Sequence, residues 1–407
     1  MTQALARRYD ALFLDLDGVV YRGDHVLPGV PEILAEVRSE GTPVLFLTNN
    51  SSRTPGQVAD ALRAMGVPAS PGEILTSAVA TASMLKRQGV EGTSAFVIGE
   101  RGIREALADI GVRILDGEPD RTDLVVVGWD RSADYPKLRT AGLLVQRGAR
   151  LIATNADASY PAPTGLWPGA GALLAAITTT TGATPTVVGK PARPLFEAAA
   201  AAAGASNPLV VGDRLDTDIA GAAGMGWDSL LVLTGSTRSS DLPWADDLPR
   251  YVGADLSILR RSPTPGRFAL ADEADAPGIE RLLASVGLSS KGVEERLDHT
   301  LVSRDRIGLV ATACLDPVGD FGILRSVAVR PDVQRDGLGM LACVAALREG
   351  RRLGRSTFAL FTETAQAFFE RLGFRKVERD TLPEPVRVGS HATEECAQSA
   401  TAMVLSR

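Results

Sequence analysis

Residues 11–18 read ALFLDLDG, a short apolar run that ends in two aspartates and a glycine. Such a run before a turn is typical of a strand buried on both faces of a parallel sheet. Short apolar runs alternate with helical patterns from this stretch outward to about residue 258. The sequence therefore predicts an α/β fold with a doubly wound parallel sheet.

The composition narrows the classes of protein to which the chain can belong. The chain has 407 residues, of which 45% are hydrophobic and 23% charged, as in globular proteins. Its net charge of −6 excludes a nucleic-acid binder that relies on a basic surface. We find no signal peptide and no uninterrupted apolar 20-mer, so we expect no membrane span and a cytoplasmic location. Cys314, Cys343 and Cys396 match no zinc spacing, and we expect reduced core thiols.

The second part of the chain follows a different pattern. RRSPTPGR at residues 260–267 is rich in Pro, Ser and Arg, which indicates an exposed linker between separately folding parts. The elements expected after it include helices at 276–286 and 293–301 and strands around residues 309 and 324. They predict a mixed α+β unit.

Polar side chains follow four predicted strands of the first part. These are Asp15, Asp17, Thr48, Asn49, Asn50, Lys190, Asp213 and Asp218. Because ligands of open parallel sheets bind at the carboxyl ends of the strands, we expect these side chains to meet. Lys190 is conspicuous, since the chain has only five lysines among 43 basic residues.

The residue types at these strand ends indicate phosphoryl chemistry. Carboxylates packed together repel one another unless a cation joins them, and oxygen ligands select a hard ion such as Mg²⁺. An aspartate can attack phosphorus to form an aspartyl-phosphate. A second acid two residues on can protonate the leaving alkoxide and later activate water.

The four segments DLDGVVY, TNNSS, GKP and GDRLDTDI, in this order, resemble the motifs of the haloacid dehalogenase-like (HAD) phosphatases. The resemblance covers about residues 8–258. It is to the class IIA branch, which includes p-nitrophenyl phosphatase-like, phosphoglycolate and glycerol-phosphate phosphatases. It implies a core domain at residues 1–82 and 185–258 and an inserted α/β cap at 83–184. A linker at 259–265 and a last domain at 266–407 would follow.

This resemblance also implies roles for single residues. Asp15 is expected to be the nucleophile and Asp17 the general acid/base, with Thr48 and Lys190 as further catalytic residues. Magnesium is expected at Asp15, the Asp17 backbone carbonyl and Asp213, with Asp218 in its outer shell. The substrate is expected to be a small phosphorylated metabolite, with glycerol 3-phosphate or phosphoglycolate favoured. Its contacts are expected at Gly18, Asn49, Asn50, Asn155 and Asp157. A phosphotransferase or phosphomutase stays open as an alternative.

In the last domain, GILRSVAVRPDVQRDGLG at residues 322–339 leads from a strand through a glycine-bearing loop into a helix. Converging backbone N–H groups at a helix N-terminus suit a pyrophosphate. With FFERLGF at 368–374, this pattern resembles the GCN5-related N-acetyltransferases (GNATs) over about residues 266–407. The resemblance implies acetyl-CoA contacts at Val327, Val329, Gln334, Arg335, Asp336, Gly337, Leu338 and Gly339.

The sequence leaves open which molecule accepts the acetyl group. The segments TETAQAFFERLGF and LPEPVR resemble amino-acid acetyltransferases of the arsenic-resistance and N-acetylglutamate synthase type. This implies a glutamate-like amine, with Arg325 and Arg387 as carboxylate contacts. Phe369, however, stands where many GNATs carry a tyrosine. The domain is therefore either an acetyltransferase or a non-catalytic module that senses acyl-CoA or supports a homodimer.

Overall fold

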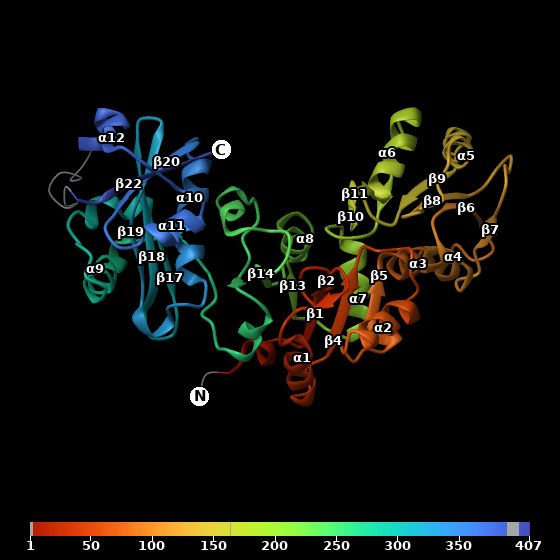
Figure 1. Cartoon of the computed structure of the whole chain (residues 1–407), viewed down its shortest axis with the longest axis horizontal. Helices are drawn as coiled ribbons and strands as arrows, with labels where there is room; N and C mark the ends of the chain where they lie inside the picture. Colours follow the sequence, from red (N-terminus) through yellow and green to blue (C-terminus); the bar gives the residue numbers. More distant parts are fainter. Residues whose placement is uncertain (1–2, 163, 389–398) are drawn as a thin grey trace. The chain divides into compact units, whose positions relative to one another are not determined.

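A computed structural model of the chain describes residues 3–162, 164–388 and 399–407. It divides into two compact units, Met1–Ser229 and Leu230–Arg407 (Figure 1). The predicted fold class, parallel sheets with an inserted α/β cap followed by a mixed α+β unit, is confirmed. The residue borders of the core, cap and linker stay predictions.

A parallel sheet forms the centre of the first unit. Its strands lie in the order β13-β1-β4-β5. Their bounds are β1 (Ala11–Asp15), β4 (Val44–Thr48), β5 (Ile74–Thr76) and β13 (Pro208–Gly212). The associated helices are α1 (Val30–Ser39), α2 (Pro55–Ala64), α3 (Ser77–Arg87), α7 (Arg193–Ala203) and α8 (Ala220–Met225). The apolar part of β1 is buried, as expected for a central strand covered on both faces.

A second parallel sheet forms the cap, in the order β12-β9-β8-β6-β7. Its strands are β6 (Ser94–Ile98), β7 (Arg113–Leu115), β8 (Leu124–Val127), β9 (Arg150–Ala153) and β12 (Thr186–Val187). The cap helices are α4 (Arg101–Ala108), α5 (Tyr135–Gln146) and α6 (Ala170–Thr181). Two short hairpins, β2 (Tyr21–Arg22) with β3 (His25–Val26) and β10 (Ser159–Ala162) with β11 (Gly165–Pro168), complete the first unit. The edge strand β12 lies in the part of the chain that the sequence assigns to the core.

The loop after β4 joins the core sheet to the cap. The carbonyl of Ser52 accepts a hydrogen bond from the backbone N–H of Gly102 at 2.9 Å. The hydroxyl of Ser51 accepts one from the Trp129 N–H at 3.2 Å and one from the Thr154 hydroxyl at 3.0 Å. Helix α3 contacts both α4 of the cap and α7 of the core, so the two sheets share one apolar core.

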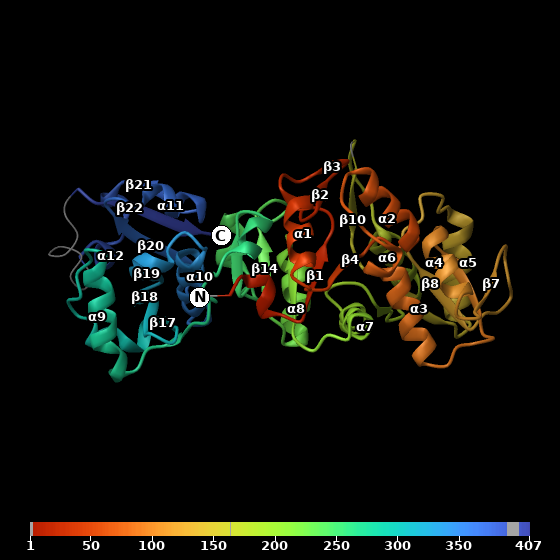
Figure 2. The same cartoon turned by 90° about the horizontal axis from the view of Figure 1, so that it is seen from below.

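The second unit contains a seven-stranded mixed sheet in the order β16-β17-β18-β19-β20-β22-β21. Its strands are β16 (Ala269–Leu270), β17 (Thr300–Arg304), β18 (Leu309–Val318), β19 (Phe321–Val329), β20 (Thr357–Thr362), β21 (Arg375–Val377) and β22 (Thr401–Ser406). Its helices are α9 (Ala276–Ser285), α10 (Leu338–Arg352), α11 (Gln366–Arg371) and α12 (Glu384–Val388). Helices α9 and α10 pack against this sheet (Figure 2). The same unit holds β14 (Ser229–Val232), which pairs with β15 (Tyr251–Gly253).

One predicted helix of the second unit is shorter than expected. Where the sequence predicts a helix at 293–301, a 3₁₀ helix (Glu294–His299) leads directly into β17. Thr300 and Leu301 are the first residues of this strand, and their pairing with β18 ends the helix. Cys314 and Cys343 are buried free thiols, while Cys396 lies outside the described residues. Among the residues described, no helix is both long and apolar enough to cross a bilayer.

The contact between Gly102 and the loop after β4 can be tested by adding one methyl group. A Cβ at this position would collide with the backbone carbonyls of Ser51 and Arg53, which cannot move as a side chain can. We expect Gly102→Ala to lower the free energy of unfolding by about 1–3 kcal/mol in urea titrations.

Gly224 provides the matched control, because it is also helical and an added Cβ there meets no atom within 4 Å. Gly224→Ala should raise the free energy of unfolding by up to about 1 kcal/mol through helix propensity. Equal effects of the two substitutions would contradict the close packing of core and cap.

Candidate active site

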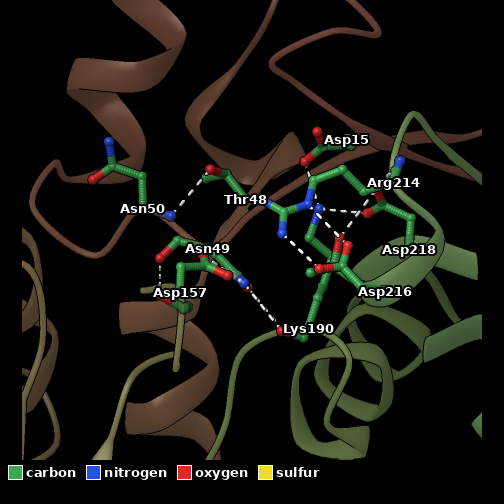
Figure 3. A network of polar contacts seen from close by, with 11 residues as sticks. Asp15, Thr48, Asn49, Asn50, Asp157, Lys190, Arg214, Asp216 and Asp218 are labelled. Carbon is green, nitrogen blue, oxygen red and sulfur yellow. Dashed lines mark hydrogen bonds and ion pairs between the residues drawn. The ribbon is translucent and has the colours of Figure 1, made fainter. Parts of the chain in front are cut away.

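The carboxyl ends of three core strands and one cap strand bring the predicted side chains together (Figure 3). Asp15 is the last residue of β1, and Thr48 is the last residue of β4 beside it. Asp213 follows β13 on the other side of β1. Lys190 comes three residues after β12 and so extends from the cap sheet.

Lys190 is the central cation of the site. Its ammonium is buried, donates a hydrogen bond to the Asp15 carboxylate, and lies 2.7 Å from Oδ1 of Asp218. Burial alone would lower the pKa of Lys190, but the attraction of Asp15 and Asp218 outweighs it and raises the pKa above its usual value. The side chain therefore carries its full positive charge here.

Three carboxylates surround this one ammonium. Burial raises the pKa of Asp15 to about 8, and the negative charges of Asp218 and Asp213 add to this increase against the opposing attraction of Lys190. Asp15, Asp213 and Asp218 can each present an oxygen within 4.8 Å of the others. One ammonium can compensate only part of the charge of three ionised carboxylates, and a divalent cation would compensate the rest. The all-oxygen donor set fits Mg²⁺.

The loop after β1 holds the second predicted acid. Asp17 is exposed, yet partial desolvation in the loop raises its pKa from the usual value, although the positive charge of Arg22 acts against this. Gly18 adopts a left-handed conformation (φ 83°), and its N–H donates to the Tyr21 carbonyl at 2.7 Å. This turn brings Asp17 and Tyr21 back beside the end of β1.

The side chains predicted to contact substrate are mostly held by other protein groups. The Thr48 hydroxyl accepts from the Asn50 N–H at 3.1 Å, and Asn50 in turn caps the backbone of Ser52 at 2.9 Å. The Asn155 carboxamide is buried and donates to the Asn49 carbonyl at 2.7 Å. Asp157 accepts from the Asn49 side chain at 3.0 Å. Asn155 and Asp157 therefore meet the loop after β4 directly.

Arg214 is a charged residue of this site that the sequence reasoning missed. Its guanidinium makes two hydrogen bonds to the Asp216 carboxylate, at 3.1 and 2.8 Å, and its side chain is 41% exposed. Its backbone N–H donates to Asp218 at 3.3 Å. The hydrogen bonds to Asp216 raise the pKa of Arg214, and the negative charges of Asp157 and Asp218 add to this increase. Its place between Asp213 and Asp216 was the available signal, but arginine is common throughout this chain.

The second unit presents the predicted glycine-bearing loop at the start of α10. Gly337 and Arg335 both adopt positive φ angles, 80° and 70°, and these angles turn the chain into the helix. The Gln334 side chain donates to the Val329 carbonyl at 2.9 Å. Asp336 forms an ion pair with Arg261, so its negative charge is compensated beside the loop. Leu338 and Gly339 form the first turn of the helix.

Strands β19 and β20 separate near this loop. They pair only from Phe321 to Ile323 with Thr357 to Ala359, while β19 continues to Val329 through a bulge at Ser326 (φ 52°). Val327 and Val329 lie on this continuation. The two predicted acceptor contacts have acidic neighbours: Arg325 lies 3.3 Å from Asp316, and Arg387 lies 3.7 Å from Asp380.

Comparisons with known proteins agree with this geometry. Residues 12–113 match the profile of the haloacid dehalogenase-like hydrolases, and residues 187–259 match a HAD-hydrolase-like profile. A 5′-nucleotidase of Bacillus subtilis is 39% identical over 259 residues, which are 63% of this chain and 99% of the relative. The chain belongs to the haloacid dehalogenase-like hydrolases. It is an enzyme of the HAD phosphatase type.

Two further relatives extend the comparison. The D-glycerol 3-phosphate phosphatase of Mycobacterium tuberculosis is 37% identical over 273 residues, which are 65% of this chain and 76% of the relative. The crystal structure of a glycerol phosphate phosphatase of that organism, in complex with magnesium, matches with a TM-score of 0.73 and 30% identity. The match covers 91% of this chain and 99% of the chain in the crystal structure. Residues 296–376 match the acetyltransferase (GNAT) domain profile, so this HAD phosphatase carries a GNAT domain.

The position of Lys190 predicts a large effect of its removal on stability. We expect Lys190→Met to lower the free energy of unfolding by about 3–5 kcal/mol in buffer with chelator, because buried carboxylates lose their cation. Lys86→Met, a substitution of an exposed lysine at the end of α3, should change it by less than about 0.5 kcal/mol. Urea titrations of both variants measure this. Similar unfolding curves for the two would show that Lys190 does not hold the carboxylates together.

Proposed function

We propose that this enzyme hydrolyses the phosphate monoester of a small organic metabolite through an aspartyl-phosphate on Asp15. Glycerol 3-phosphate and phosphoglycolate are the favoured substrates. The observation that carries the proposal is the gathering of Asp15, Asp213 and Asp218 around the buried ammonium of Lys190. A carboxylate that is held beside an ammonium, at a site that a divalent cation would complete, is suited to attack a phosphate group.

The two aspartates after β1 divide the reaction between them. A carboxylate oxygen of Asp15 attacks phosphorus, the ester P–O bond breaks, and Asp17 gives its proton to the leaving alkoxide. In the second step Asp17 takes a proton from water, whose oxygen attacks the same phosphorus. The bond between phosphorus and Asp15 then breaks, which releases phosphate and restores both aspartates.

The other residues hold the reactants in place. The ammonium of Lys190 keeps the Asp15 carboxylate oriented and compensates part of the negative charge. The residues proposed to hold magnesium are Asp15, Asp213 and the Asp17 carbonyl, with Asp218 beside them; the ion would draw negative charge from the phosphate oxygens. Thr48 and Asn49, at the end of β4 beside β1, are proposed to hold the phosphate.

The choice of glycerol 3-phosphate rests on the relatives named for it. One is a D-glycerol 3-phosphate phosphatase, and the matching solved structure of a glycerol phosphate phosphatase covers 91% of this chain, which includes most of both units. Other relatives are named as a 5′-nucleotidase and as acid sugar phosphatases. A screen of phosphorylated metabolites is therefore the direct test of the substrate.

In this screen we expect turnover of glycerol 3-phosphate or phosphoglycolate with magnesium and none with excess chelator, measured as released phosphate. Asp15→Asn should lower kcat by at least about 10³-fold with the fold intact, because the nucleophile is lost. Asp10→Asn, one residue before the opposite end of β1, should stay within about twofold of the wild type.

Two outcomes would contradict the proposal. Substantial turnover by a folded Asp15→Asn variant would mean that Asp15 is not the nucleophile. Heavy-oxygen water distinguishes the alternative reaction. Hydrolysis places the label in the released phosphate, whereas a phosphotransferase or phosphomutase passes the phosphoryl group to a hydroxyl, so that an unlabelled phosphate ester forms and no inorganic phosphate is released.

For the GNAT domain we propose binding of acetyl-CoA at the loop from Gln334 to Gly339. The left-handed Gly337, the start of α10 and the separation of β19 from β20 support this site. Transfer of the acetyl group to a glutamate-like amine is the further proposal, with Arg325 and Arg387 as carboxylate contacts. Phe369 is buried against Phe368 and Phe374, so this position offers no hydroxyl for protonating the thiolate.

Gly339 allows a selective test of the loop. An added Cβ there lies 3.4 Å from Val329 and 3.9 Å from Phe368, which are ordinary contacts. A circular-dichroism spectrum checks that Gly339→Val, which has a larger side chain, is folded. We expect it to weaken acetyl-CoA binding at least about tenfold in titration calorimetry, with phosphatase kcat unchanged. Wild-type affinity in the variant would contradict the assigned loop. Binding by the wild type without acetyl transfer to glutamate-like amines would favour the sensor alternative.

A further inference from the structure

The position of Lys190 depends on the cap sheet. Strand β12 pairs with β9, and the pairing continues with the N–H groups of Val188 and Gly189, which donate to the carbonyls of Ala153 and Thr154 at 3.0 and 2.7 Å. Lys190 is the next residue. Asp15, by contrast, ends a strand of the core sheet. The ion pair between Lys190 and Asp15 therefore joins two separate sheets, and any shift of the cap edge would move the ammonium.

The Asn49 carboxamide holds the backbone of Lys190 on both sides. The Lys190 N–H donates to Oδ1 of Asn49 at 2.8 Å, and Nδ2 of Asn49 donates to the Lys190 carbonyl at 3.1 Å. Asn49 follows β4, so this clamp comes from the core sheet. Gly189 makes the approach possible, because a Cβ there would lie 2.6 Å from Oδ1 of Asn49.

The same side chain also binds the cap loop. The second N–H of Nδ2 donates to Oδ2 of Asp157 at 3.0 Å (Figure 3). The backbone carbonyl of Asn49, separately, accepts from the Asn155 side chain at 2.7 Å. Both donors of the carboxamide are therefore used within the protein. The side chain has no donor left for a phosphate oxygen.

We infer that the side chain of Asn49 is a positioning group that fixes Lys190 against Asp15 and links this position, through Asp157, to the cap loop. The inference rests on the proposed phosphatase function and gives the Asn49 side chain a role other than substrate contact. A carboxamide offers both the acceptor and the donor that the N–H and the C=O of one residue, Lys190, require. Aspartate at this position lacks the donors and would face the carboxylate of Asp157.

Steady-state kinetics with two phosphate esters of different leaving groups tests the inference. A displacement of about 1 Å costs a catalytic step about 10²-fold, so Asn49→Ala should lower kcat by about that factor for both esters. We expect KM to stay within about threefold. Asn207→Ala, an exposed asparagine before the opposite end of β13, should behave as the wild type. A raised KM with unchanged kcat would make Asn49 a substrate contact and overturn the inference.

Labelling of lysine amines gives a readout that does not depend on activity. The Lys190 side chain is 4% exposed, whereas that of Lys137 is 35% exposed and serves as the internal reference. We expect Asn49→Ala to raise acetylation of Lys190 relative to Lys137 at least tenfold under a short pulse of an N-hydroxysuccinimide ester, measured by peptide mass spectrometry. Unchanged protection of Lys190 would overturn the positioning role.

A double-substitution cycle tests the link to the cap. Asp157→Ala should lower kcat in the wild type but have no further effect in Asn49→Ala, because both substitutions remove the same hydrogen bond. A substrate-contact role of Asp157 would instead give an effect that persists in both backgrounds and differs between the esters. Failure of the proposed function and failure of this inference give different results. An active Asp15→Asn variant overturns the proposed function. A fully active Asn49→Ala variant, together with an inactive Asp15→Asn variant, overturns only the inference about Asn49.

Discussion

The buried ion pair between Lys190 and two carboxylates is the constraint on which the rest of the active site depends. Asp15 and Asp218 approach each other only because an ammonium lies between them. The cost of burying these charges is offset by their mutual attraction and by hydrogen bonds that satisfy the lysine. Substitution of any one of these charged residues is destabilising, because the loss of one charge leaves the others unpaired in a low-dielectric environment. The surplus negative charge then explains why this region suits a divalent cation and a phosphate together.

Holding the ion pair requires that two sheets meet without a gap. The loop after β4 enters the edge of the cap, where Gly102, Gly128 and Gly189 leave room for its backbone and for Ser51 and Asn49. Hydrogen bonds from Trp129 and Thr154 to Ser51 then satisfy polar groups that are removed from water at this contact. The motif that the sequence presents as a phosphate loop is thus also the joint between core and cap. Catalytic geometry and domain packing share the same few residues.

Much of this was predictable from the sequence, for physical reasons. Apolar runs that end in polar residues define parallel strands, and parallel strands place those residues at one edge, so Asp15, Thr48 and Asp213 were expected to meet. Orientation of side chains was not predictable, because Asn49 could serve a phosphate or a peptide unit equally well. The assignment of β12 to the cap sheet was also out of reach, since a strand of two residues carries no periodic signal. The predicted helix at 293–301 ends at His299, because strand pairing of Thr300 and Leu301 with β18 outweighs local propensity.

The placement of Lys190 beyond β12 limits how the cap of this enzyme can be exchanged for another. An inserted cap suggests an exchangeable module, which could be removed at the two crossings between the domains and replaced by another. In this chain the second crossing occurs after an edge strand that is hydrogen-bonded to the cap sheet and is followed by the buried Lys190. A foreign cap must therefore supply a matching edge for that strand, or the transplanted hybrid will misplace its lysine. New substrate ranges would thus be reached more readily by altering cap residues one at a time than by exchanging the module.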